Sequence, residues 1–182
     1  MKRWLTVGLI AVGSMAHAGA QESTIVARFD GAIAVTPIAN VVLPADADGT
    51  FSRVSRNVVR GVDPAGPWRI ADLKAVVRSD GRITVNGRGL LVAAGNRIGQ
   101  NLNQSVFATL ICEAAAPFVE LNTELAGVPL DANGDFRIDG TLSPLPPVEC
   151  ASPLLLIRSS GSRAWFAAAI QKIEPVADPR AR

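Results

Sequence analysis

Few residues of this chain are suited to acid–base or nucleophilic catalysis. The only histidine is His17, which lies in a leader that we expect to be removed, and the chain has no tyrosine. A mature protein without histidine cannot form a Ser-His-Asp or Cys-His site, nor a His-ligated zinc site. Two carboxylates can hydrolyse glycosidic bonds. Glu120 and Glu124 are the candidates, but their spacing does not mark them as a pair, and solvated residues in or just after a strand explain them better. Neither Lys74 nor Lys172 belongs to an S-x-x-K motif, so we assign no catalytic residue.

Oxygen-bearing side chains recur at alternate positions after residue 130, as they do in calcium-binding loops. The four candidate metal ligands are Asp131, Asn133, Asp135 and Asp139. This segment departs from an EF-hand at the sixth position, which is Phe136 in place of glycine, and at the twelfth, which is Leu142 in place of glutamate. A hairpin with an acidic outer face explains the same residues, so calcium is one of two interpretations and no other cofactor is expected.

Two loops supply candidate ligand-binding residues. The segment Gly95–Gln104 is rich in side-chain amides, and the rigid loop 63–68 ends in a tryptophan. Amides with an aromatic ring nearby suit sugars or peptide backbone. The candidate binding residues are Trp68, Asn96, Arg97, Asn101 and Asn103. The alternative for each is a turn residue or, for the tryptophan, a place in the core.

Cys112 and Cys150 are the only cysteines. In an exported chain a lone pair of cysteines usually forms a disulfide. The alternative is a reactive thiol, but no histidine lies near Cys112 to activate it. We therefore predict one Cys112–Cys150 disulfide.

The N-terminus has the organisation of a cleavable signal peptide. Lys2 and Arg3 precede an uncharged, mostly apolar run that ends in small residues, and cleavage fits after Ala18 or, preferably, after Ala20. A membrane anchor is the alternative, but the run is nearer 13 residues than the roughly 20 that a spanning helix needs. The sequence thus predicts an exported protein, periplasmic or extracellular, with no transmembrane segment after signal removal.

Removal of this leader leaves 16 basic and 16 acidic residues, so the mature chain is close to neutral. No basic cluster and no basic stretch interleaved with aromatic residues occurs along the sequence. Nucleic acid is therefore not an expected partner. The expected partner is an unidentified protein or carbohydrate.

Alternation of apolar and polar residues dominates the rest of the chain. Ala71–Arg78 and Arg82–Arg88 alternate on either side of a tight turn at residues 79–81, which predicts a hairpin with Leu73 and Ile83 among the inward residues. A second hairpin is predicted around Asn133-Gly134, with a type I′ turn. Further strands are expected at 24–29, 32–36, 57–61, 105–112, 118–123, 153–158 and 164–170. Only 165–173 has a helical alternative, because of its alanines.

About eight or nine short strands separated by Gly-, Pro- and Asn-containing loops are typical of a sandwich or barrel. We predict an all-β, single-domain antiparallel β-sandwich, Ig-like or related, with one disulfide. Its domain organisation is a signal peptide at 1–20, the β-sandwich domain at 21–173 and a flexible C-terminal tail at 174–182.

Six segments resemble a group of small exported bacterial β-proteins for which no activity is known. They are Arg28–Ile33, Asn57–Val62, Asp80–Ile83, Ser105–Ala108, Gly134–Asp139 and Trp165–Ala168. The resemblance spans most of the mature chain and implies export and a bacterial source. It implies no activity, cofactor or catalytic residue.

Three functions remain open on these grounds. The first is a non-catalytic binding or structural module of the bacterial envelope, since β-sandwiches commonly present loops on a rigid frame. The second is a carboxylate-dependent hydrolase that acts on extracellular carbohydrate. The third is a calcium-stabilised structural protein.

Overall fold

The structure, a computed structural model, describes residues 23–36, 40–41, 54–55 and 57–173. The predicted leader at 1–20 and tail at 174–182 lie outside these residues. The one short helix of the described residues is a 3-10 turn, η1 (Gly95–Arg97), and none of their helices is long and apolar enough to cross a membrane. The strands are β1 (Ile25–Ala34), β2 (Asn40–Val41), β3 (Val54–Ser55), β4 (Trp68–Arg69), β5 (Asp72–Arg78), β6 (Arg82–Arg88), β7 (Leu91–Val92), β8 (Ser105–Ile111), β9 (Leu121–Asn122), β10 (Val128–Pro129), β11 (Phe136–Thr141), β12 (Leu154–Ser159) and β13 (Trp165–Gln171).

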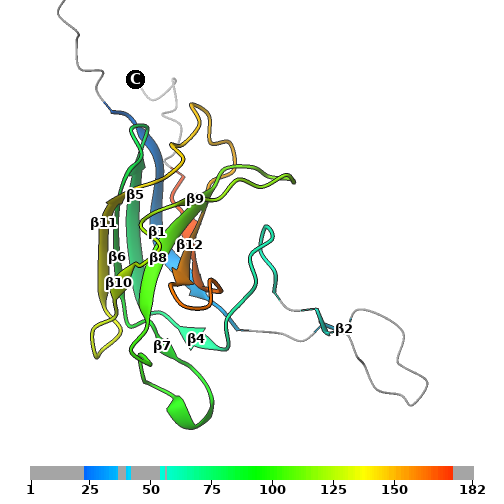
Figure 1. Cartoon of the computed structure of the whole chain (residues 1–182), viewed down its shortest axis with the longest axis vertical. Coiled ribbons are helices and arrows are strands. Elements are labelled where there is room, and N and C mark those ends of the chain that lie inside the picture. The colour runs from blue at the N-terminus through cyan, green and yellow to red at the C-terminus, as the bar shows by residue number, and fades with distance from the viewer. Residues whose placement is uncertain (1–22, 37–39, 42–53, 56, 174–182) are drawn as a thin grey trace, which may run out of the picture.

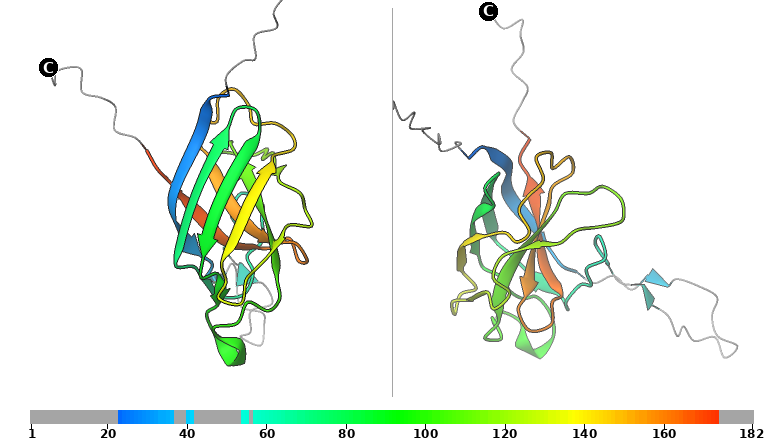
Figure 2. Two further views of the ribbon diagram at one scale, coloured as in Figure 1. Left: turned by 90° about the vertical axis from the view of Figure 1, so that its left-hand side faces the viewer. Right: turned by 45° about the horizontal axis from the view of Figure 1, so that its top comes forward.

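Eight strands form one antiparallel sheet in the order β10-β8-β12-β13-β1-β5-β6-β11, and β9 pairs with β8 off this path. The sheet curls until it is nearly barrel-shaped (Figures 1 and 2). Its two ends are joined where the Asn122 and Ser143 backbones exchange hydrogen bonds of 3.0 and 2.8 Å. The all-β, antiparallel prediction is confirmed, whereas the Ig-like sandwich stays a prediction.

The core lies inside the curved sheet and follows the predicted alternation. On β5, Leu73, Ala75 and Val77 are buried while Lys74 is exposed. Ile83 and Val85 of β6 are buried in the same layer. Strands β8 and β12 differ, because nearly every residue on both of their faces is buried. The half of the sheet around β8 and β12 is therefore buried on both faces, whereas β5 and β6 leave their outer face partly exposed.

The predicted hairpin at 71–88 is confirmed, with β5 paired to β6 throughout. The second hairpin is wrong as a strand pairing: β10 pairs with β8, and β11 pairs with β6. The turn between them is present, but only Gly134 (φ 82°) has a positive φ there, so the turn is not type I′. The chain reverses direction at this turn, where Asp131 N–H donates to Asp135 O at 2.9 Å, but β10 and β11 then pair with strands at opposite ends of the strand order. Leu130 N–H donates to Gln104 O at 2.9 Å.

Other strand predictions are confirmed in part. The expected strands at 24–29 and 32–36 are one strand, β1, with an irregularity between Phe29 and Ala32 at which Gly31 has a φ of 90°. The strand expected at 57–61 is wrong: Arg60 has a positive φ, and this segment makes only an isolated bridge from Val59 to Val62. The segment with the helical alternative is a strand, β13.

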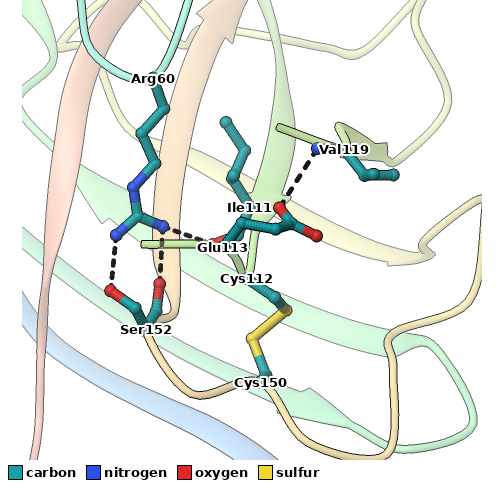
Figure 3. The surroundings of a disulfide bond; sticks show 7 residues. All are labelled: Arg60, Ile111, Cys112, Glu113, Val119, Cys150 and Ser152. Carbon is teal, nitrogen blue, oxygen red and sulfur yellow. Dashed lines mark hydrogen bonds between the residues drawn. A yellow bond between two sulfur atoms is a disulfide. The ribbon is translucent and has the colours of Figure 1, made fainter. Parts of the chain in front are cut away.

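The predicted disulfide is confirmed and crosslinks two loops at the end of the sheet (Figure 3). Cys112 and Cys150 are 38 residues apart in sequence, and their Cα atoms lie 4.7 Å apart. The Arg60 guanidinium donates to Ile111 O at 3.0 Å, to Ser152 O at 2.6 Å and to Ser152 Oγ at 2.6 Å. Arg60 therefore connects the loop before β4 to the backbone on both sides of the crosslink.

Candidate functional site

The segment Gly95–Gln104, which we call the amide loop, follows β7 at the end of the sheet opposite the disulfide (Figure 1). Backbone hydrogen bonds close it at its base: Val92 N–H donates to Gln100 O at 3.0 Å, and Gly99 N–H donates to Val92 O at 2.9 Å. Leu102 and Asn103 both have positive φ angles, of 52° and 50°. The loop therefore has a defined backbone path and leaves most of its side chains on the outside.

Asn101 holds the amide loop against the segment between β10 and β11. Its Nδ2 donates to Leu130 O at 3.1 Å and to Asp131 O at 2.9 Å. Its Oδ1 accepts from Asn103 N–H at 3.0 Å. Both amide protons and the amide oxygen are thus engaged, so the contribution of the Asn101 side chain is to position the loop.

A pocket of about 700 Å³ lies between these two segments. Its lining is mixed, with amide, charged and aliphatic side chains. The lining residues are Arg97, Gly99, Gln100, Asn101, Leu102, Asn103, Leu130, Asp131 and Ala132. Three of the five predicted binding residues are brought together here. The facing wall is formed by residues 130–132. Sequence reasoning assigned Asp131 to a metal site and did not identify its two neighbours.

The polar side chains around this pocket have unused hydrogen-bonding capacity. The side chains of Arg97, Gln100, Asn103 and Asp131 make no hydrogen bond or ion pair with any other residue of the described ranges. Arg97 offers five N–H donors, the two amides offer donors and acceptors, and Asp131 offers carboxylate acceptors. The pocket therefore presents hydrogen-bond donors and acceptors, and both a positive and a negative charge.

The other two predicted binding residues lie elsewhere. Asn96 is exposed on η1 and does not line the pocket. Trp68 is 5% exposed, and its ring centroid lies 4.1 Å from that of Phe166. Both rings contribute to a neighbouring hollow of about 450 Å³, which shares Leu102 with the first pocket. The tryptophan is thus mainly a core residue with one edge towards this second hollow.

Three of the four candidate calcium ligands, Asn133, Asp135 and Asp139, are engaged in hydrogen bonds or ion pairs. Asn133 Oδ1 accepts from Asp135 N–H at 3.2 Å, and Asp135 Oδ1 accepts from Gly89 N–H at 3.0 Å. Asp139 pairs with Arg137 on the same strand, and this hydrogen bond, together with one from Thr84, lowers the pKa of the Asp139 carboxyl. No group of three or more His, Cys, Asp or Glu side chains that could hold a metal ion occurs in the part of the chain that the structure describes.

The two carboxylates considered for glycoside hydrolysis are in different surroundings. Glu120 Oε2 lies 2.6 Å from Nη1 of Arg158, whose side chain is 8% exposed. Glu124 lines a different pocket, of about 550 Å³, that contains no second carboxylate. In each of five pockets among the described residues, at most one carboxylate lines the wall.

Comparison of the chain with protein-family models, with curated proteins and with solved structures gives no match.

Proposed function

We propose that this protein is an exported, non-catalytic binding module, periplasmic or extracellular, that holds its ligand in the pocket beside the amide loop. Under this proposal the curved sheet, with its inner faces opposed in the manner of a β-sandwich, serves as the rigid frame. The resemblance to small exported bacterial β-proteins and the pattern of the first twenty residues support export to the bacterial envelope.

One observation carries the proposal. Asn101 fixes the loop to the Leu130 and Asp131 carbonyls, while the side chains of Arg97, Gln100, Asn103 and Asp131 around the pocket have no partner among the described residues. A fixed backbone that presents unpaired donors and acceptors around a concavity is the arrangement by which binding sites gain specificity without reorganisation.

The chemistry of the lining indicates a neutral or zwitterionic polar ligand. Arg97 and Asp131 supply opposite charges, and the amides of Gln100 and Asn103 match hydroxyl groups or peptide units. Because Trp68 is buried, ring stacking contributes little, and hydrogen bonds are the main source of affinity. A short carbohydrate or an extended peptide meets these requirements.

The test is a titration of isotope-labelled protein followed by amide chemical shifts. Di-N-acetylchitobiose, which has both hydroxyl and amide groups, and triglycine serve as probes. We expect saturable shifts in residues 97–103 and 130–132 with at least one probe. If neither probe shifts these residues, or if the shifts map elsewhere, the proposal is wrong.

Variants sharpen this test. Asn103→Ala and Arg97→Ala each remove a lining side chain and should weaken binding about 2- to 10-fold, the range for one lost hydrogen bond. Asn96→Ala removes an exposed amide from the same loop but outside the pocket. It is the matched control and should leave the affinity unchanged.

A further inference from the structure

A second hollow adjoins the pocket beside the amide loop. Its volume is about 450 Å³, and Leu102 belongs to the lining of both. Three segments surround this second hollow: the loop that leads into β4, residues 102 and 104 of the amide loop, and the turn that joins β12 to β13. They meet at the end of the sheet where the amide loop lies (Figure 1). The two concavities are therefore neighbours at one end of the protein.

The two concavities differ in chemistry. The pocket beside the amide loop is lined by amides, by Arg97 and by Asp131. The second hollow is lined by no charged residue, and most of its side chains are apolar. The apolar ones are those of Pro64, Ala65, Trp68, Leu102, Ala164 and Phe166. A polar, charged pocket beside an uncharged, mainly apolar hollow suits a ligand that carries both kinds of group.

Leu102 forms the wall that the two concavities share. Its φ is 52°, and its half-buried side chain packs against the core. A leucine in this left-handed region is uncommon, because its Cβ crowds the following backbone. The shared wall is therefore apolar, and the backbone conformation of the loop fixes its position.

Gln104 adds a free hydrogen-bond donor at the same boundary. Its Oε1 accepts from Ser159 Oγ at 2.9 Å, and its backbone N–H donates to Asn101 O at 3.1 Å. Its Nε2 has no hydrogen-bond partner among the described residues. The side chain is thus held in place, and its NH₂ group remains able to donate to a ligand carbonyl.

Backbone hydrogen bonds hold the other walls of the second hollow. Ala65 N–H donates to Trp165 O at 3.0 Å, and Trp68 N–H donates to Val35 O at 3.0 Å. In the turn between β12 and β13, Ser159 N–H donates to Ala164 O at 2.9 Å. An apolar hollow with walls already in place takes up a side chain with little ordering cost.

The charges of the first pocket distinguish a peptide from a neutral sugar. Arg97 lies on the amide loop and Asp131 on the facing wall, and neither makes an ion pair within the part of the chain that the structure describes. A short peptide with free ends brings a carboxylate for the guanidinium and an ammonium group for the carboxylate. A neutral sugar brings neither, so its binding would leave both charges unpaired.

We propose that the two concavities form one site for a short peptide with a large apolar side chain. The peptide backbone binds beside the amide loop, and the side chain passes Leu102 and fills the second hollow. This assignment depends on the function proposed for the amide-loop pocket, which it narrows from a polar ligand to a peptide. A neutral side chain such as that of leucine matches the hollow, because a charged one would lose its water and find no partner there.

The experiment compares three tripeptides, Gly-Gly-Gly, Gly-Leu-Gly and Gly-Asn-Gly, by titration of the isotope-labelled protein followed by amide chemical shifts. Asparagine is close to leucine in size and shape but is polar. We expect Gly-Leu-Gly to bind about 10-fold more tightly than the other two, as burial of a leucine side chain predicts. Its shifts should extend from residues 97–103 and 130–132 to residues 64–66 and 159–164.

Two variants place a carboxylate inside or outside the second hollow. Ser162→Glu adds it at an exposed residue of the lining, whereas Asn96→Glu adds it at an exposed residue that lines neither concavity. The measured quantity is the ratio of the affinities for Gly-Leu-Gly and Gly-Gly-Gly, because a change in net charge affects both peptides equally. We expect Ser162→Glu to lower this ratio about threefold or more and Asn96→Glu to leave it unchanged.

The possible failures are distinguishable. If di-N-acetylchitobiose or Gly-Gly-Gly binds beside the amide loop and leucine adds no affinity, this inference is wrong while the proposed function stands. If no probe shifts residues 97–103 or 130–132, both are wrong. Shifts from Gly-Leu-Gly confined to the second hollow would show two separate sites and also overturn the inference. A larger gain from methyl to butyl glucoside than from glycine to leucine would indicate an acylated carbohydrate in place of a peptide.

Discussion

Gly87 offers the sharpest test of how the curved sheet is packed. It lies in the middle of β6, opposite Leu73 on β5 and Phe136 on β11. A Cβ atom at this position would lie 2.2 Å from both Cε1 and Cζ of the Phe136 ring. The ring therefore occupies the space that any other residue at position 87 would need. Because the φ of Gly87 is not positive, a Gly87→Ala change alters packing and not the allowed backbone.

We expect Gly87→Ala to destabilise the protein by about 2 kcal/mol, within the range for overpacked cores. For a domain of this size that corresponds to a thermal midpoint roughly 4–8 °C lower. Gly66 is the matched control, since no atom lies within 4 Å of its added Cβ and its φ is not positive. Gly66→Ala should leave the midpoint almost unchanged.

A double-mutant cycle isolates the contact between Gly87 and Phe136. Phe136→Leu removes Cε1 and Cζ, the atoms nearest to the added Cβ. In that background Gly87→Ala should cost little or even stabilise, because alanine restricts the unfolded chain more than glycine does, by about 0.5–1 kcal/mol. Urea denaturation of the four proteins measures the coupling. An equal cost of Gly87→Ala in both backgrounds would refute the packing argument.

Three further predictions concern the crosslinked end and the ion pairs. Replacement of both Cys112 and Cys150 by alanine should lower the free energy of unfolding by about 4 kcal/mol, since the bond closes a loop of 38 residues; urea denaturation of oxidised protein and variant measures this, and equal midpoints would contradict it. Arg60→Lys should cost about 1.5–3 kcal/mol, because an ammonium group cannot reproduce its hydrogen bonds to three acceptors; an unchanged urea midpoint would be inconsistent with that role. The lowered pKa of Asp139 beside Arg137 means that this carboxylate stabilises the folded state above its unfolded pKa of about 3.9 and loses that effect as the pH falls through its folded pKa. Wild type should therefore be more stable than Asp139→Asn at pH 7, and this difference should vanish in strong acid, as urea midpoints across that range would show.

The candidate sites show where sequence reasoning was sufficient and where it was not. The amide content of Gly95–Gln104 pointed to the loop that lines a pocket of about 700 Å³. The facing wall at 130–132 was not predicted, because its contact with the loop depends on hydrogen bonds from the Asn101 side chain to backbone carbonyls 29 and 30 residues away. Trp68 is apolar and follows a turn, and sequence alone could not decide between a ligand contact and the core.

The sequence by itself determined the local properties of this protein. Alternation with a period of two identified the strands of the first hairpin and the faces they bury, since neighbouring side chains on a strand point in opposite directions. Because the chain has one pair of cysteines and a predicted signal peptide, only one intramolecular disulfide could be predicted. The first inference depends only on residues that are close in sequence, and the second only on the number of cysteines.

Only the tertiary structure decided which strands are neighbours. The segments on either side of Asn133-Gly134 have the pattern of a hairpin, yet β10 joins β8 and β11 joins β6, because curling of the sheet brings its two ends together there. The outer surface of the sheet has the same origin: Arg28, Lys74 and Lys172 are distant in sequence and line one hollow only because their segments are brought together. Pairing between distant strands is a property of the whole sheet, since it is set by how all the apolar faces are buried at once.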